Sequence, residues 1–128
     1  MKTVAEVSLF IVEDDDLFRE TFVDAMALRG AKVSGARTGA EALKALRTQR
    51  PSLILIDVQL PDIHGFDLCR CLKKSERLKD IPVVFLSAST RYSDPRDRVE
   101  GVLAGAAAFL PKPVTFEKLQ SVIAALVR

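Results

Sequence analysis

The sequence contains no tryptophan, one tyrosine, one histidine and two cysteines among its 128 residues. Zinc sites are built from several His and Cys ligands, and His64, Cys69 and Cys71 are too few and too poorly spaced to form one. The two cysteines lie two positions apart in a predicted helix, where their side chains diverge and do not favour a disulfide. We therefore expect one core thiol and one surface thiol, in a protein kept in the reducing cytoplasm.

Neither sign of charge is in large excess, since 19 basic and 17 acidic residues leave a formal net charge of +2. This balance gives no indication of a surface that binds nucleic acids or membranes through non-specific electrostatics. No apolar run approaches the roughly 20 residues needed to span a bilayer. With 48% hydrophobic and 28% charged residues, the composition indicates one globular domain over residues 1–128.

Short apolar runs alternate with stretches of helical periodicity along the whole chain. The five runs of strand length cover residues 7–12, 31–36, 53–56, 83–86 and 107–110. Runs that are apolar on both faces, separated by helices, indicate a parallel sheet covered on both sides. Thr38 and Thr115 are placed to cap helices, and Gly30 to end one. The sequence therefore predicts an α/β fold of five strand and helix units.

Polar residues follow four of these runs at the point where each strand should end. They are Glu13 and Asp14 after the first run, Asp57 after the third, Ser87 after the fourth and Lys112 after the fifth. In open α/β sheets the carboxyl ends of parallel strands meet at one edge, and ligands bind there. A carboxylate such as Asp57 directly after a buried run costs free energy unless its charge has a use.

Three carboxylates and one lysine leave this edge with two net negative charges, which would raise the carboxyl pKa values unless a cation joined them. Oxygen ligands favour Mg²⁺, and the absence of His and Cys at these positions disfavours zinc. A metal, a lysine and a hydroxyl around one carboxylate suit phosphoryl transfer. In this hypothesis Asp57 is the nucleophile that becomes phosphorylated.

Four motifs in register strengthen this hypothesis: "FIVEDDDLFRE", "LILIDVQLPDIHGFDLCRCLK", "VVFLSAST" and "GVLAGAAAFLPKPVTFEKL". Together they make the chain resemble the receiver domain of two-component response regulators over nearly its whole length. The resemblance implies a flavodoxin-like, doubly wound, five-stranded parallel sheet with strand order 2-1-3-4-5 and five helices. It also implies a phosphorylation-controlled signalling switch rather than an enzyme acting on other molecules.

The resemblance assigns a role to each residue at the predicted edge. Asp57 is the phosphoacceptor, Lys112 pairs with the phosphate, and Ser87 is the switch hydroxyl. Mg²⁺ is held by Glu13, Asp14, Asp57 and the backbone carbonyl of Gln59. Phe109 stands at the aromatic switch position, and the peptide bond before Pro113 is expected to be cis.

The same resemblance implies the partners. The phosphoryl group would come from a sensor histidine kinase or a histidine phosphotransfer protein. The downstream protein would bind the face formed by the fourth helix, fifth strand and fifth helix, with no direct binding to nucleic acid and no insertion into a membrane. Three departures from the family pattern are Ser87 in place of the commoner threonine, the lack of acidic residues in "GAAAFL", and Pro111 before the lysine. The last two change this face, so we do not expect family dimers formed through it to transfer to this chain.

Two other functions remain open from the sequence. A degenerate receiver would act as a phosphorylation-independent interaction module. An Mg²⁺-dependent phosphohydrolase would normally place a second aspartate two residues after the nucleophile, where this chain has Gln59. Because the chain ends directly after its last predicted helix, we expect output through protein contacts, from a stand-alone receiver, a phosphorelay intermediate or a receiver cut from a longer protein.

Overall fold

A computed structural model describes residues 2–87 and 95–127 of the chain. Its single sheet has five parallel strands in the order β2-β1-β3-β4-β5, as predicted. The strands are β1 (Ser8–Val12), β2 (Lys32–Ala36), β3 (Leu53–Asp57), β4 (Val83–Ser87) and β5 (Ala108–Pro111). Three of them, β3, β4 and β5, end one residue beyond the predicted apolar runs, so Asp57 and Ser87 are the last residues of their strands rather than the first residues of loops.

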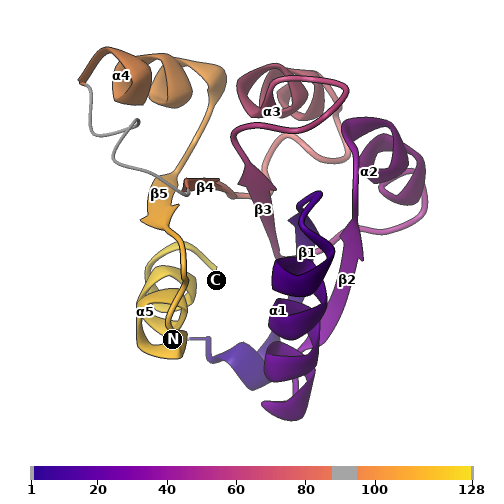
Figure 1. Cartoon of the computed structure of the whole chain (residues 1–128), viewed down its shortest axis with the longest axis vertical. Coiled ribbons are helices and arrows are strands. Elements are labelled where there is room, and N and C mark those ends of the chain that lie inside the picture. Colours follow the sequence, from indigo (N-terminus) through magenta and orange to yellow (C-terminus); the bar gives the residue numbers. More distant parts are fainter. Residues whose placement is uncertain (1, 88–94, 128) are drawn as a thin grey trace.

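Helices cover both faces of the sheet (Figure 1). They are α1 (Asp16–Leu28), α2 (Gly39–Ala45), α3 (Gly65–Lys73), α4 (Pro95–Ala104) and α5 (Phe116–Leu126). Figure 1 shows α1 and α5 on one side of the sheet and α2, α3 and α4 on the other. The doubly wound α/β architecture expected from the sequence is therefore confirmed.

Each face of the sheet has its own hydrophobic core. One core packs Phe10, Ile54 and Phe85 against α2, α3 and α4, and the other packs Ile11, Leu55 and Leu86 against α1 and α5. All residues of β3 and β4 are buried, because these strands are covered on both faces. In the described ranges, no helix has the length and apolar character required to cross a bilayer.

Side-chain caps fix several helix ends. The Asp15 carboxylate accepts a hydrogen bond from the Phe18 N–H at the start of α1, at 3.1 Å. Thr38 and Thr115 cap α2 and α5 as predicted. Gly30, just after α1, has a φ of 93°, which confirms the expected end of that helix. One thiol, that of Cys69, is buried and the other, that of Cys71, is exposed, as the sequence indicated.

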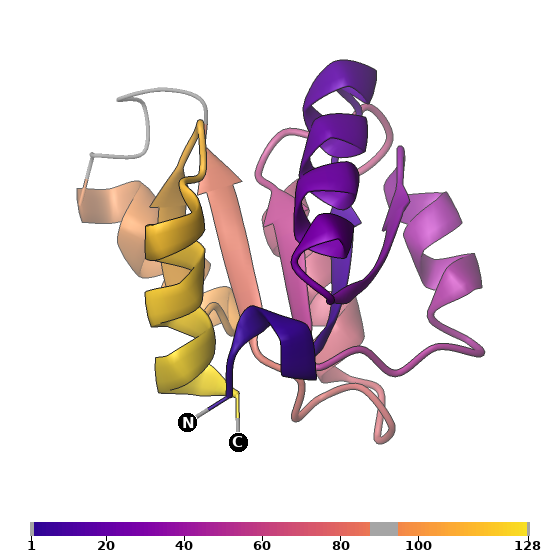
Figure 2. The ribbon, with the colours of Figure 1, turned by 90° about the horizontal axis from the view of Figure 1, so that it is seen from below.

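A short 3₁₀ helix, η1 (Val4–Glu6), precedes β1 and was not predicted. Val4 is buried, and its N–H donates to the Gln120 side-chain oxygen of α5 at 3.0 Å. The Gln120 amide in turn donates to the Lys2 carbonyl at 3.2 Å. These contacts hold the start of the chain against α5, and Figure 2 shows both ends of the chain together at the amino ends of the strands.

Candidate functional site

The predicted residues meet at the carboxyl ends of the central strands. Glu13 directly follows β1 and is fully buried, while Asp14 beside it is exposed. Asp57 ends β3 with 8% of its surface exposed, and Lys112 directly follows β5. The order of the strands therefore brings together side chains from positions 13, 14, 57 and 112.

Lys112 is the cation of this site. Its ammonium group donates to a carboxylate oxygen of Glu13 and, at 3.2 Å, to Oδ2 of Asp57. The other Asp57 oxygen, Oδ1, accepts the Gln59 N–H at 3.1 Å. Both oxygens of Asp57 thus have a hydrogen-bond donor before any ligand arrives, and such donors stabilise developing negative charge.

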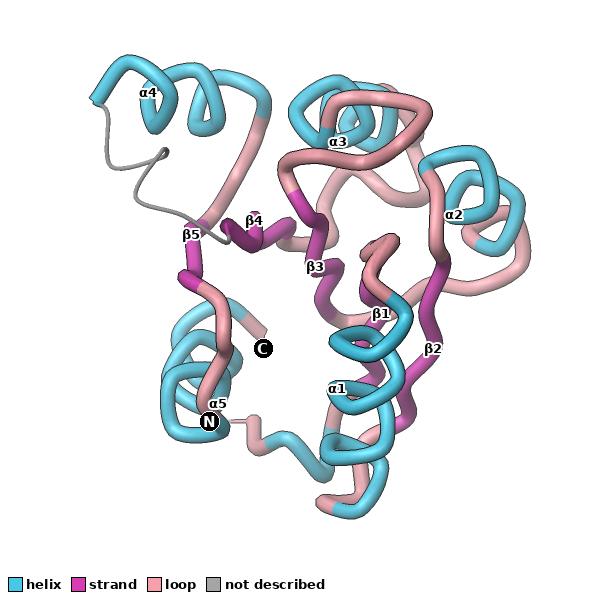
Figure 3. The backbone as a smooth tube through the Cα atoms, viewed as in Figure 1, coloured by secondary structure: helices cyan, strands magenta, loops and turns pink. Residues whose placement is uncertain are grey.

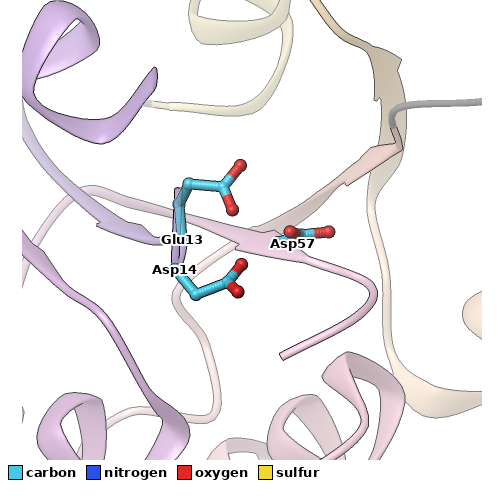
Figure 4. A group of neighbouring side chains, drawn as sticks. All are labelled: Glu13, Asp14 and Asp57. Atoms are coloured by element: carbon cyan, nitrogen blue, oxygen red, sulfur yellow. The ribbon is translucent and has the colours of Figure 1, made fainter. Parts of the chain in front are cut away.

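Three carboxylates converge on one small volume. Glu13, Asp14 and Asp57 each offer an oxygen, and these oxygens lie within 4.8 Å of one another. Figure 4 shows the three side chains facing a common space from the ends of two strands. An all-oxygen set with one exposed member suits a hard cation that keeps some of its waters, as Mg²⁺ does. The donor set therefore fits magnesium better than zinc.

The electrostatics of the site also favour a cation. Burial and the neighbouring Asp57 carboxyl raise the pKa of Glu13 to about 7, although Lys112 opposes the rise. Burial alone would lower the pKa of Lys112, but its bond to Glu13 and the charge of Asp57 raise it above its ordinary value. One lysine does not fully compensate the buried carboxylates, and a bound divalent cation would reduce the remaining repulsion.

The loop after Asp57 is held close to α3. A Cβ at Gly65 would lie 2.5 Å from the Asp57 carbonyl oxygen, so only glycine allows this approach. Gly65 donates its N–H to the Val58 carbonyl at 2.7 Å. His64, predicted to be a surface loop residue, is exposed and also caps α3, because its Nδ1 accepts the Phe66 N–H at 3.1 Å. These contacts fix the segment that carries Asp57 and Gln59.

The other predicted residues surround this centre. Ser87 ends β4, the strand beside Asp57, with 8% of its surface exposed, and its carbonyl accepts the Lys112 N–H at 2.9 Å. Gln59 pairs with His64 through the backbone in an isolated antiparallel β-bridge. Phe109 lies on β5, three residues before Lys112, and its ring packs on that of Phe85 at 5.5 Å between centroids.

Comparison with known proteins identifies the family. A family model described as the response regulator receiver domain matches residues 9–124. The chain belongs to this family. The cis peptide bond expected between Lys112 and Pro113 is present in this receiver domain.

Two relatives are regulators about twice as long as this chain. The receiver domain is 38% identical to the transcriptional regulatory protein AfsQ1 of Streptomyces coelicolor, over 94% of this chain and 51% of that protein. It is also 38% identical to the transcriptional regulatory protein GltR of Pseudomonas aeruginosa, over 94% of this chain and 49% of that protein. The chain thus spans about half the length of these relatives.

Solved structures agree with this assignment. The signal receiver domain of a histidine kinase from Syntrophus aciditrophicus is 36% identical, with a TM-score of 0.81 over 94% of this chain and 89% of that one. The receiver domain of the sensor histidine kinase PA1611 from Pseudomonas aeruginosa is 26% identical, with a TM-score of 0.79 over 94% of this chain and 96% of that one. That second structure contains a magnesium ion coordinated in its active site cleft.

Two residues of the site region were missed by the sequence analysis. No role at the site was predicted for Phe18, yet its ring centroid lies 4.9 Å from the Lys112 ammonium nitrogen. Asp62 accepts the N–H groups of Gly39 and Ala40 at 2.9 Å each, which lowers the pKa of its carboxyl. Its position in a polar loop gave no signal that it would cap a helix 22 residues earlier.

Proposed function

We propose that this protein is a phosphorylation-controlled signalling switch in which Asp57 is the phosphoacceptor. The observation that carries the proposal is the position of Asp57, at the end of a buried strand with Lys112 on one oxygen and two further carboxylates beside it. The donor of the phosphoryl group would be a phosphohistidine of a sensor histidine kinase or of a histidine phosphotransfer protein.

The transfer itself forms one bond and breaks one. An oxygen of the Asp57 carboxylate attacks the phosphorus, and the bond from phosphorus to the imidazole nitrogen breaks, with the electron pair staying on that nitrogen. Lys112 is within reach of the new acyl phosphate, because it already donates to Oδ2 of Asp57 at 3.2 Å. Its charge would stabilise the oxygens of the phosphoryl group as negative charge collects there.

Glu13, Asp14 and Asp57, with the backbone carbonyl of Gln59, would hold Mg²⁺ in this reaction. The bound ion would supply charge neutralisation for the transferring oxygens. Glu13 would need to be ionised to bind it, so its raised pKa of about 7 links metal binding to pH.

The response to phosphorylation would pass through Ser87 and Phe109. We propose that the Ser87 hydroxyl moves toward the new phosphoryl group and that Phe109 fills the space it leaves. A protein partner would then read the rearranged face of α4, β5 and α5. Moving a population from mostly inactive to mostly active needs about 5.5 kcal/mol of differential stabilisation, which charge-assisted bonds to a phosphoryl group can supply.

Intact-protein mass spectrometry after incubation with acetyl phosphate tests the proposal. We expect one phosphoryl addition in the presence of Mg²⁺, none with EDTA, and none in Asp57→Asn. Asp14→Ala should lose labelling together with its Mg²⁺ dependence, whereas Leu17→Ala, altered at an exposed neighbouring position, should label like wild type.

Other outcomes would point to the alternative functions. Absence of labelling in a folded wild-type protein, by acetyl phosphate and by phosphohistidine donors, would favour a phosphorylation-independent interaction module. Sustained release of phosphate from a small phosphomonoester would favour a phosphohydrolase. Labelling that survives in Asp57→Asn would show that the acceptor is another residue.

A further inference from the structure

The ammonium group of Lys112 has a third neighbour besides the two carboxylates. It donates to Glu13 and Asp57, and on another side it faces the ring of Phe18, 4.9 Å from the ring centroid. Only 14% of the Lys112 side chain is exposed. A cation within about 6 Å of a ring centroid is attracted to the negative face of the ring, and the attraction grows as water is excluded.

The position of Phe18 is set by the same loop that carries the site carboxylates. Its N–H donates to the Asp15 carboxylate at 3.1 Å, which starts α1 directly after Asp14. The next residue, Arg19, donates to the carbonyl of Glu13 at 2.8 Å. The first turn of α1 is therefore tied to the end of β1, and the ring of Phe18 is presented to the site by a fixed backbone.

The lysine side chain has a flexible four-carbon stem, so its ammonium group can also rotate out of the site into solvent. Phe18 opposes that motion, because leaving the ring would cost the cation its contact with the aromatic face. When a phosphoryl group arrives, Lys112 must exchange its bond with Asp57 for one with a phosphoryl oxygen. The contacts with Glu13 and Phe18 would keep its ammonium group near Asp57 during this exchange.

We propose that Phe18 is a positioning residue for Lys112, which it holds beside Glu13 and Asp57 for pairing with the phosphoryl group on Asp57. The inference rests on the proposed function of Asp57. Phe18 also packs against the core between the sheet, α1 and α5. Its test therefore has to separate an effect on Lys112 from an effect on packing.

The rate of Asp57 labelling by acetyl phosphate with Mg²⁺ is compared in Phe18→Leu and Phe18→Tyr. Leucine retains apolar bulk but has no aromatic face, whereas tyrosine retains the face. We expect about a three- to tenfold slower rate in Phe18→Leu and a rate within about twofold of wild type in Phe18→Tyr. Leu17→Ala, which changes an exposed side chain of the same turn, is the matched control and should keep the wild-type rate.

A double-mutant cycle shows whether the effect passes through the lysine. In a Lys112→Ala background, Phe18→Leu should cause no further loss of rate. An equal further loss there, or an unchanged rate in Phe18→Leu alone, would overturn the proposal and leave Phe18 with a packing role. Thermal unfolding of each variant identifies any loss that comes from an unfolded fraction.

A second measurement does not depend on phosphorylation. In nuclear magnetic resonance spectra, the ε-methylene protons of Lys112 should be shifted upfield by the Phe18 ring and should return to ordinary values in Phe18→Leu. If wild-type protein is not labelled but this shift is present, the proposed function has failed while the lysine and ring contact stands. If the shift is absent in wild type, the positioning role is wrong whatever the labelling shows.

Discussion

At the scale of single residues, Lys112 is the group on which the charge balance of the site depends. It is the cation that contacts both Glu13 and Asp57. Without it, two neighbouring carboxylates would face each other at a mostly buried position, and the charged form of Glu13 would become still less favourable. The lysine thus favours the ionised form of Glu13 as well as contacting Asp57.

We therefore expect Lys112→Ala to stay folded at neutral pH with Glu13 protonated, since a neutral carboxyl is tolerated in a buried site better than an unpaired charge. Labelling of Asp57 should persist but should be slower by roughly tenfold or more, because a cation that stabilises the transferring oxygens is lost. The phosphorylated variant should also show a weaker change in the Phe109 ring resonances than phosphorylated wild type.

Lys112→Met is the matched control, because it keeps most of the side-chain volume and removes only the charge. A full Phe109 response in either phosphorylated variant would show that the lysine does not link the phosphoryl group to the switch. Rates and spectra recorded on the same samples make the comparison direct.

The residues at this site differ in how well the sequence predicted them. Glu13, Asp57, Ser87 and Lys112 stand directly at the ends of apolar strands, and strand ends of a parallel sheet must converge, so sequence position was sufficient. Phe18 is one of several apolar residues of α1. The pattern of these residues does not indicate which of them also contacts a lysine 94 positions later in the sequence. The functional roles assigned to the four strand-end residues, and to Gln59, remain predictions.

At the scale of elements, β5 and α4 are joined by one aromatic ring. A Cβ on Gly101 of α4 would lie 2.2 Å from Cζ of Phe109, so the tip of the ring touches the bare backbone of the helix. The Arg98 guanidinium lies 5.4 Å from the centroid of the same ring, and the Phe66 ring lies 6.4 Å away. Because the ring is in contact with α4, we expect any movement of Phe109 to affect the position of that helix.

Gly101→Ala tests this contact through the sign of its effect on stability. In a free helix the change would stabilise by about 0.5–1 kcal/mol, because alanine is the better helix former. Here the new methyl group overlaps the ring, and we expect net destabilisation of about 1 kcal/mol or more, as for other overpacked sites. Urea unfolding of both proteins measures the difference.

The control is the same substitution in a Phe109→Leu background, where the shorter side chain removes the overlap. There Gly101→Ala should become neutral or stabilising. If Gly101→Ala stabilises the wild-type protein by the full helix-propensity amount, the ring does not occupy the position described and its coupling to α4 is lost.

At the scale of the whole molecule, the buried Glu13 makes the stability of the metal-free protein depend on pH. Its pKa is about 7 in the folded state against an ordinary value of 4.5, so the folded protein binds this proton more tightly than the unfolded chain. The stabilisation is fully present below pH 4.5 and is lost as the pH rises through 7. Lys112, whose pKa is raised, stays charged throughout this range.

In EDTA, the free energy of unfolding should therefore fall between pH 5 and pH 8, by roughly 2 kcal/mol, because one pKa unit corresponds to about 1.4 kcal/mol. Urea unfolding at the two pH values gives the change, and Glu13→Gln should remove most of it. Added Mg²⁺ should restore stability at pH 8 more than at pH 5. An equal pH dependence in Glu13→Gln would assign the effect to other groups.

The overall topology was the part most fully predicted from the sequence, and the structure near the start of the chain was the least predicted. Apolar runs such as residues 53–56 and 83–86, short and alternating with helical stretches, favour strands of a doubly covered sheet, and this predicts the layers and the edge where ligands of such folds bind. The turn of η1 has only two buried apolar residues nearby, Val4 and Val7. Its position depends on hydrogen bonds with Gln120, 116 residues away, for which a local pattern carries no signal.

The placement of the chain ends has a practical consequence for building a sensor from this protein. Both ends leave the molecule from the side opposite Asp57, beside the Gln120 contacts (Figure 2). The sheet has five parallel strands, and Figure 3 shows that the last of them, β5, leads into α5, which returns the chain to the amino ends of the strands. A surface tether or a fluorescent label attached at either end would therefore leave the edge that carries Asp57 turned toward solution.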